Sequence, residues 1–249
     1  MDIEPQPQSV RVVTGAARSL GAAIALALGG PGTAVVVHYH GRAAEAQAVV
    51  KQLRSAGGPA YATQADLREP GAADRMLDEA IERWGRLDVV VANAGAPNPG
   101  VDVQTGTDDD LSQLLAVNAT AVYAVLRAAS SRLGAGGRLI NIGSSSTLYP
   151  RPERALYSAS KAASLVLTEA FATVLAGRGA TANSVVVGPV DDGFLAHAPD
   201  AVKEQLAAAG PAGRLATADD VAGVVKFLAG EESRWIIGQQ ILVNGGALV

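Results

Sequence analysis

Tyr157 and Lys161 lie four positions apart in the stretch ALYSASKAA, residues 155–163, and their side-chain types are suited to proton transfer. On a helix the two side chains share one face, with Cβ atoms roughly 6 Å apart. One interpretation is a solvated lysine beside a tyrosine on the surface. The other is a phenol, with a pKa of ~10 in water, whose pKa is lowered by the adjacent ammonium so that it acts as a general acid. The pair by itself leaves both interpretations open.

A glycine-rich turn near the N-terminus has the composition of a phosphate-binding loop. In VVTGAARSLGAAIALAL, residues 12–28, the turn follows a predicted strand and opens a predicted helix, which is the context that a dinucleotide-binding turn requires. Gly15 permits the tight turn, and Gly21 permits close packing of the helix on the strand, so that backbone N–H groups face a pyrophosphate. Glycine is common in any strand–helix turn, so this turn alone does not establish a nucleotide site.

The end of the second predicted strand indicates which nucleotide would bind. A carboxylate there would bond the ribose 2′-hydroxyl of NAD, but the residues are HYHGR, 38–42, without an acid. Arg18, Arg42 and the two imidazoles favour a 2′-phosphate, which predicts NADPH as the cofactor. The alternative is that His38 and His40 only cap the end of the strand. No metal site is predicted, because the chain has only 3 histidines.

Short Val- and Ile-rich runs alternate with helical patterns along the whole chain and must position these residues. Such runs, mostly without polar alternation, are typical of parallel strands buried on both faces. Strands are expected at 10–14, 33–38, 60–64, 87–93, 137–142, 181–187 and 239–244, and helices at 19–29, 43–56, 70–84, 108–132, 153–176 and 219–229. The alternation predicts right-handed βαβ units. We therefore expect an α/β fold: a Rossmann-type doubly wound parallel sheet of about seven strands with helices on both faces.

The chain is expected to form a single domain. We assign residues 10–249 to the domain and residues 1–9 to a flexible tail, because MDIEPQPQS is acidic and rich in Pro and Gln. The segment 191–214 is rich in Gly and Pro and breaks the strand–helix alternation. Long insertions of this kind are often lids over a site, so we expect a substrate lid there; a plain surface loop is the alternative.

The bulk composition argues against several classes of function. The absence of Cys excludes disulfides, thiolate metal sites and thiol catalysis. The formal net charge is −4 and no basic block is present, which argues against a nucleic-acid partner. The N-terminus lacks the features of a signal peptide, and GGPG at 29–32 interrupts the apolar stretch 20–37. We therefore expect a cytoplasmic protein without a membrane-spanning segment.

Several motifs, taken in order and at their spacings, resemble the short-chain dehydrogenase/reductase family over nearly the whole chain. They are TGAARSLG (14–21), AD (65–66), ANAG (92–95), VNA (117–119), INIGS (140–144), YSASK (157–161) and VNGG (243–246). Each motif is unspecific alone, but the complete series is highly specific. The resemblance implies a Rossmann fold and oxidoreductase chemistry on C=O and CH–OH groups.

The resemblance also implies catalytic roles for four residues. Tyr157 would donate a proton to a ketone oxygen while a hydride reaches the carbon, and Lys161 would tune Tyr157 and hold the ribose hydroxyls. Ser144 would donate a hydrogen bond to the same oxygen and stabilise charge that develops in the transition state. Asn118 would hold a water in a proton chain behind Lys161. The residues expected to bind the cofactor are Gly15, Arg18, Ser19, Leu20, Gly21, His38, Tyr39, His40, Arg42, Asp66, Leu67, Asn93, Ala94, Gly95, Tyr157, Lys161, Gly188, Val190 and Asp192.

Three positions depart from the family pattern. Ser19 replaces the middle glycine of the phosphate turn, so the turn must relax or the hydroxyl must face the cofactor. Ala92 replaces the first Asn of an NNAG stretch. After the sixth strand the chain reads VGPVDD, 187–192, where the family has Pro-Gly and later a Thr beside the nicotinamide amide. Asp192 is expected to accept a hydrogen bond from that amide.

The expected activity is NADPH-dependent reduction of a ketone or a 3-oxoacyl-type carbonyl, on a thioester- or polyketide-like small molecule. The surroundings resemble bacterial 3-oxoacyl-carrier-protein reductases and polyketide ketoreductases, while HYHGRAAEA, 38–46, resembles pteridine reductases. Pterin or imine reduction and alcohol oxidation are the alternatives within the family. A non-catalytic NADP(H)-binding sensor is the alternative from another class. The resemblance further implies a homotetramer or homodimer formed through the helices at 108–132 and 153–176.

Overall fold

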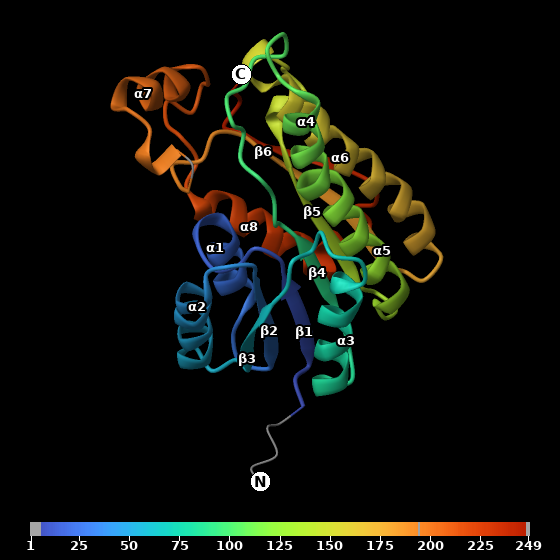
Figure 1. Ribbon diagram of the computed structural model, residues 1–249. Helices are drawn as coiled ribbons and strands as arrows, with labels where there is room; N and C mark the ends of the chain where they lie inside the picture. The colour runs from blue at the N-terminus through green and yellow to red at the C-terminus, as the bar shows by residue number, and fades with distance from the viewer. Residues whose placement is uncertain (1–5, 194, 248–249) are drawn as a thin grey trace.

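Seven parallel strands form one sheet at the centre of the computed structural model, which describes residues 6–193 and 195–247 (Figure 1). The strands are β1 (Ser9–Val13), β2 (Thr33–Tyr39), β3 (Ala60–Gln64), β4 (Val89–Ala92), β5 (Arg138–Ser144), β6 (Thr181–Val187) and β7 (Gln240–Val243). Their order across the sheet is β3-β2-β1-β4-β5-β6-β7. The order reverses between β1 and β4, and in such sheets ligands bind beyond the carboxyl ends of the strands at that point.

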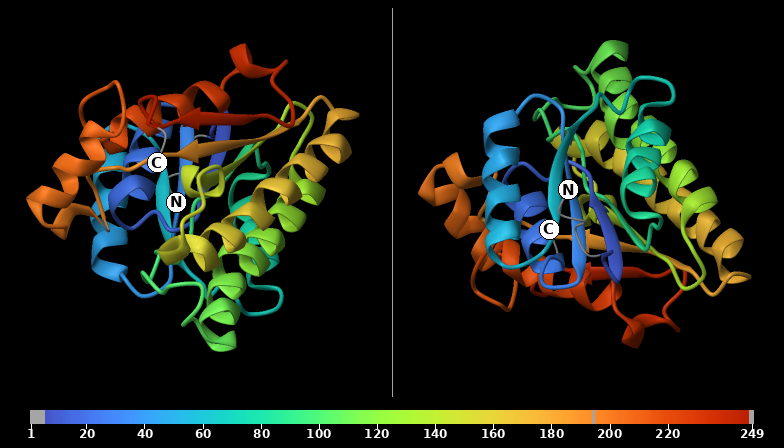
Figure 2. Two further views of the ribbon diagram at one scale, coloured as in Figure 1. Left: turned by 90° about the horizontal axis from the view of Figure 1, so that it is seen from above. Right: turned by 90° about the horizontal axis from the view of Figure 1, so that it is seen from below.

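Helices cover both faces of the sheet, as both views in Figure 2 show. The α-helices of the described chain are α1 (Ser19–Leu28), α2 (Ala43–Ser55), α3 (Ala72–Trp84), α4 (Asp108–Leu115), α5 (Val122–Arg132), α6 (Ala155–Ala176), α7 (Asp200–Ala208) and α8 (Ala218–Leu228). Apolar residues of α1, α2 and α8 form one core with one face of the sheet. Those of α3, α5 and α6 form a second core with the other face. The predicted doubly wound architecture is confirmed.

The apolar pattern of β2 shows why the strands lack polar alternation. Ala34 and Val36 belong to one core, whereas Val35 and Val37 belong to the other, and all four are fully buried. Successive side chains of a strand point to opposite faces. A central strand with a core on each side must therefore be apolar at every position.

A single predicted helix over 108–132 is three consecutive elements in the structure. A capping box between Thr107 and Asp110 starts α4, and a π-helical stretch, Ala116–Ala121, joins α4 to α5. Such π-helical bulges often occur at functional sites, and this one contains Asn118. The acidic run at 108–110 therefore serves the helix start, where acids also suit the helix dipole.

The N-terminal boundary differs from the prediction. The backbone N–H of Gln8 donates to the carbonyl of Gly32 at 2.8 Å, and β1 begins at Ser9. The predicted tail is therefore wrong for residues 8 and 9, because their backbone groups extend the pairing with the start of β2. Residues 1–5 of the predicted tail, and 248–249 at the end of the predicted domain, lie outside the described residues.

The segment 191–214 carries a 3-10 turn, Leu195–His197, and the short helix α7. None of the residues of α7, all of which are described, is buried, and α7 lies at the periphery of the molecule (Figures 1 and 2). The Nζ of Lys203 lies 2.8 Å from an Asp191 carboxylate oxygen and donates to the carbonyl of Ala196. One lysine thus ties α7 to the chain that leaves β6.

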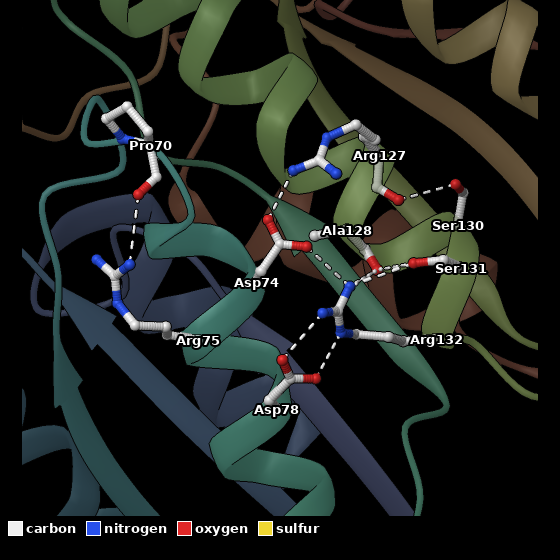
Figure 3. Close-up of polar contacts among 9 residues, drawn as sticks. All are labelled: Pro70, Asp74, Arg75, Asp78, Arg127, Ala128, Ser130, Ser131 and Arg132. Carbon is white, nitrogen blue, oxygen red and sulfur yellow. Dashed lines mark hydrogen bonds and ion pairs between the residues drawn. The ribbon is translucent and has the colours of Figure 1, made fainter.

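Two helical stretches, Asp108–Arg132 and Pro152–Ala176, have the length and hydropathy of membrane spans. Core helices of globular proteins meet the same criterion. Both stretches pack here against the sheet and against each other. Ion pairs also hold α5 to α3, where Arg132 and Arg127 contact Asp74 and Asp78 (Figure 3). Packing within this fold accounts for the buried part of their apolar surface.

Candidate active site

Ser144 and Tyr157 are brought together because β5 ends where α6 begins. Ser144 is the last residue of β5, and Tyr157 lies in the first turn of α6. The Ser144 side chain is close enough to the Tyr157 phenol to influence its pKa. Burial raises the pKa of the Tyr157 phenol above its usual value, and Ser144 lowers it only in part. The prediction of a more acidic phenol is therefore wrong for the protein without a bound nucleotide, because burial raises its pKa and Lys161 is not among the groups that lower it.

Lys161 is buried on the inner face of α6. Its Nζ donates to the carbonyl oxygen of Ile142 on β5 at 3.1 Å. Burial lowers the pKa of Lys161 to about 8. A Cβ at Gly95 would lie 3.1 Å from this Nζ and 3.0 Å from the side-chain oxygen of Asn118. Only a glycine lets the loop after β4 approach the lysine this closely.

Asn118 clamps the loop after β4. From the π-helical stretch, its Oδ1 accepts from the N–H of Ala96 at 2.8 Å, and its Nδ2 donates to the Ala96 carbonyl and to Ser160 Oγ. The Ser160 hydroxyl in turn donates to the Tyr157 carbonyl at 2.7 Å. The side chain is thus committed to protein groups, and the expected role of Asn118 in holding a water stays a prediction. Sequence reasoning missed Ser160, although it lies inside YSASK.

A cavity of about 840 Å³ opens beyond the carboxyl ends of β1, β2 and β4. The predicted cofactor residues that line it are Gly15, Arg18, Ser19, Leu20, Gly21, His38, Tyr39, His40, Arg42, Asp66, Leu67, Asn93, Ala94 and Gly95. Asn118, Ser144, Tyr157 and Lys161 are not among the described lining residues. They adjoin the cavity through the loop after β4, since Gly95 and Ala96 line it and contact Lys161 and Asn118.

The phosphate turn has the geometry that a dinucleotide requires. A Cβ at Gly21 would lie 2.1 Å from the carbonyl oxygen of Gly15, so only glycine fits there. Arg18 is the N-cap of α1, and within the described chain its side chain forms no capping hydrogen bond. The first N–H groups of α1 therefore remain for an anion at the helix N-terminus. The cavity volume and this cradle fit a dinucleotide.

Ser19 has kept the backbone shape of the glycine that it replaces. Its φ is +54°, in the left-handed region, which costs a residue with a Cβ about 1–2 kcal/mol. A Cβ at Gly193 would lie 3.2 Å from Ser19 Oγ, so the hydroxyl faces the segment after β6. Ser19 and Gly193 both line the cavity, so the predicted alternative in which the hydroxyl faces the cofactor stays open.

The His38 side chain lies beneath the phosphate turn and links two backbone segments through its ring nitrogens. Its Nδ1 accepts from the N–H of Gly15 at 3.1 Å, and its Nε2 lies 3.1 Å from the carbonyl of Ala65. Nε2 must therefore carry the proton. Burial is the main cause that lowers the pKa of His38 to about 4. The expectation that His38 helps to hold a 2′-phosphate is thus corrected, because both ring nitrogens are committed to the backbone.

Charged side chains gather at the adenosine end of the cavity. Arg42 lies 3.1 Å from Glu45, and the Asp66 carboxylate lies 2.6 Å from Arg68 and 3.7 Å from the exposed His40. Hydrogen bonds from Arg68 lower the pKa of Asp66 to about 2. Arg68 also lines the cavity and was missed in the sequence. Its position two residues after the expected adenine-contacting acid was the available signal.

Besides Tyr157 and Lys161, three further residues predicted to bind the cofactor lie outside the cavity lining. Among the described residues, Gly188, Val190 and Asp192 do not line it. Asp192 Oδ1 accepts from the N–H of Gly193 at 2.6 Å, so this oxygen closes a local turn. A Cβ at Gly188 would lie 2.6 Å from Asn244, which gives that glycine a packing role. The expected contact of Asp192 with a carboxamide stays a prediction, for which the second carboxylate oxygen would have to serve.

Comparisons with known proteins identify the family of the chain. Residues 15–247 match a family described as enoyl-(acyl carrier protein) reductase. A short-chain type dehydrogenase/reductase from Picea abies is 36% identical over 247 residues, which cover 95% of this chain and 91% of that protein.

Two solved structures share the whole fold. LugOII, described as a promiscuous reductase that catalyses keto-reduction at C1 during lugdunomycin biosynthesis, is 36% identical with a TM-score of 0.91, covering 99% of this chain and 100% of that one. Landomycin C-6 ketoreductase LanV, solved with NADP and rabelomycin, is 34% identical with a TM-score of 0.88, covering 97% of each chain. Together with the family match and the order of its motifs, these similarities show that the chain is an oxidoreductase of the short-chain dehydrogenase/reductase family.

Proposed function

We propose that this protein is an NADPH-dependent ketoreductase that converts a carbonyl of a polyketide-like or 3-oxoacyl substrate to an alcohol. The observation that carries the proposal is the convergence of Ser144, at the end of β5, with Tyr157, one helical turn from the buried Lys161 whose Nζ bonds Ile142 on the same strand. A serine and a tyrosine that converge at one point match the needs of a single carbonyl oxygen. The keto-reductions described for LugOII and LanV support this reaction.

The residues divide the work of a carbonyl reduction. When bound, the reduced nicotinamide supplies the hydride that is added to the carbonyl carbon. Tyr157 donates its phenolic proton to the oxygen, which completes the alcohol. Ser144 donates a hydrogen bond to that oxygen and stabilises its growing negative charge. The ammonium of Lys161 favours the phenolate that Tyr157 leaves behind.

The choice of NADPH over NADH rests on the adenosine end of the cavity. Arg18 and Arg42 line that end, and guanidinium groups bind phosphate oxygens through paired, charge-assisted hydrogen bonds. The acidic residue that would accept from a free 2′-hydroxyl is absent from 38–42. LanV with bound NADP supports the same choice.

The same proposal includes a homodimer or homotetramer formed through α4, α5 and α6. Val166 and Val174 on α6 are 66% and 62% exposed, and Tyr123 on α5 is 43% exposed. Apolar patches on a helical face that does not contact the sheet commonly mark interfaces. Light scattering coupled to size exclusion tests this, and a monomer at micromolar concentration contradicts it.

The activity is tested with NADPH and a panel of aromatic polyketide ketones, 3-oxoacyl thioesters, simple ketones and pterins. We expect turnover with the ketones or thioesters. In Tyr157→Phe, kcat should fall by about 10²–10⁴-fold. NADPH should still bind, because the phenylalanine ring keeps the packing of the tyrosine ring. Tyr123→Phe, on the outer face of α5, is the matched control and should keep full activity. Turnover with pterins alone, or normal turnover in Tyr157→Phe, contradicts the proposal.

A further inference from the structure

Ser146 lies beside Ser144 and has no part in the reaction described above. It is buried in the 3-10 turn Ser145–Thr147, which follows directly after β5. The hydroxyl oxygens of Ser146 and Ser144 are 3.0 Å apart, and the backbone N–H of Ser146 donates to Ser144 Oγ at 3.3 Å. One residue therefore makes two contacts with the same catalytic oxygen.

The direction of the hydroxyl–hydroxyl bond follows from burial. A buried hydroxyl that does not donate its proton loses a hydrogen bond that water would have accepted. Within the described residues, the partner of Ser146 Oγ is Ser144 Oγ. Ser146 O–H therefore donates, and Ser144 Oγ accepts.

The remaining proton of Ser144 then has one direction open to it. A serine hydroxyl has two acceptor positions and one proton. The N–H and the O–H of Ser146 fill both acceptor positions, so the Ser144 proton is left to point away from Ser146, toward the side where the Ser144 side chain influences the Tyr157 phenol. The lowering of the Tyr157 pKa by Ser144 has the sign expected when Ser144 is the donor.

We propose that Ser146 is a positioning residue that fixes Ser144 as a hydrogen-bond donor toward Tyr157 and the substrate carbonyl oxygen. The inference rests on the proposed carbonyl reduction and deepens it. Without the Ser146 hydroxyl, one acceptor position of Ser144 becomes vacant, and its hydroxyl is free to rotate away from the reacting oxygen. The loss falls on the transition state, where the oxygen carries most charge, and so on kcat rather than KM.

Neighbouring hydroxyls supply matched controls. Thr147 Oγ1 donates to the Ser144 carbonyl at 2.8 Å, so it supports the turn without touching Ser144 Oγ. Ser145 is equally buried and adjoins Ser146 in the chain. Thr147→Val and Ser145→Ala therefore probe the turn alone, whereas Ser146→Thr restores a hydroxyl at the proposed position.

The kinetic test uses the full-length enzyme and the best ketone of the panel. In Ser146→Ala we expect kcat to fall about tenfold, with KM and NADPH affinity within about twofold. Ser146→Thr should recover most of kcat, and both turn controls should stay within about twofold. Ser146→Ala should add little to Ser144→Ala, because both act through one hydroxyl. An unchanged kcat in Ser146→Ala, an equal loss in Ser145→Ala, or full additivity with Ser144→Ala overturns the proposal.

A second measurement needs no substrate and separates this inference from the proposed function. The ultraviolet absorbance of tyrosinate is titrated with pH in wild type and in Ser146→Ala, and the Tyr157→Phe curve is subtracted from each. We expect the Tyr157 transition to move to higher pH in Ser146→Ala, because its donor is less well oriented. An unmoved transition overturns the positioning role, whereas wild-type protein that reduces no ketone contradicts only the proposed function.

Discussion

The Nζ of Lys161 donates a hydrogen bond to the carbonyl oxygen of Ile142, 3.1 Å away on the neighbouring strand. This contact anchors the ammonium to the sheet near the end of β5, where Ser144 lies. Burial nevertheless lowers the pKa of Lys161 to about 8, because a single carbonyl replaces much of its water. The charge that the proposed mechanism needs is therefore present at neutral pH and is lost in mildly alkaline solution.

The first prediction concerns the pH profile of carbonyl reduction. Lys161 carries its proton below its pKa and loses it above, so kcat/KM should fall as pH rises through about 8. The measurement is the initial rate with NADPH between pH 6 and 10, taken at intervals of ~0.5 pH unit. The Lys161→Met variant should turn over more slowly, and its kcat/KM should not show this fall with rising pH. A wild-type profile that stays level to the alkaline end of the range contradicts the assignment.

The second prediction concerns the two arginines at the adenosine end. Removing Arg18 and Arg42 together should weaken NADPH binding by about a hundredfold or more, because two charge-assisted contacts to a phosphate are lost. NADH affinity should change by less than about threefold, since NADH lacks that phosphate. Fluorescence titration of both nucleotides measures the effect, and Lys51→Ala, an exposed position on α2, is the control. Equal losses for both nucleotides would falsify the 2′-phosphate assignment.

The fold was predictable because its signals are local. The unbroken apolar run of 34–37 places a strand between two cores, and Val35 and Val36 do lie in different cores. The glycine turn likewise follows from local steric demands, since Gly21 cannot carry a Cβ. These features depend on neighbours in the sequence or on burial alone, so pattern and residue type suffice to find them.

The site was less predictable because its details depend on tertiary contacts. The π-helical stretch exists where Asn118 clamps Ala96, and the sequence carries no signal of that contact. The burial that raises the pKa of Tyr157 arises from packing around α6. His38 shares the parity of the buried Ala34 and Val36 along β2. Because both parities of β2 face a core, this position alone does not set the direction of the ring, which follows from its contacts with Gly15 and Ala65.

The third prediction uses the buried His38 as a stability probe. Its folded pKa of about 4 lies below the unfolded value of about 6.5. Between these values the unfolded state binds more protons, so the free energy of unfolding should fall as pH drops from 6.5 to 4, by about 3 kcal/mol in total. His38→Asn keeps an acceptor for the Gly15 N–H but cannot titrate, so its profile should be flatter. Urea unfolding at several pH values measures the difference.

The exposed His197 is the control for that experiment. Its side chain lies in the 3-10 turn before α7, where folding changes its surroundings little. His197→Asn should keep the full wild-type slope of stability against pH. If His38→Asn and wild type lose stability in parallel over this range, the assignment of His38 as an uncharged, buried side chain is wrong.

The fourth prediction concerns the ion-pair cluster between α3 and α5 (Figure 3). The guanidinium of Arg132 bonds both carboxylate oxygens of Asp78, at 2.7 and 2.9 Å, and one oxygen of Asp74 at 3.0 Å. The Arg132 side chain is only 20% exposed, so these bonds are better shielded than ordinary surface pairs. Arg75 on the same α3 contacts the Pro70 carbonyl and Glu69 from a side chain that is 67% exposed.

Arg132→Ala should lower the free energy of unfolding by about 1–3 kcal/mol, because it breaks a two-oxygen charged contact and leaves the Asp78 carboxylate without this partner, whereas Asp74 keeps Arg127. Arg132→Lys should recover only part of this, since an ammonium cannot span both oxygens of Asp78. Arg75→Ala should cost less than about 0.5 kcal/mol, as exposed pairs generally do. Urea denaturation at low and high salt measures the stability of all three variants. Equal effects of Arg132→Ala and Arg75→Ala would show that the cluster does not stabilise the packing of α3 on α5.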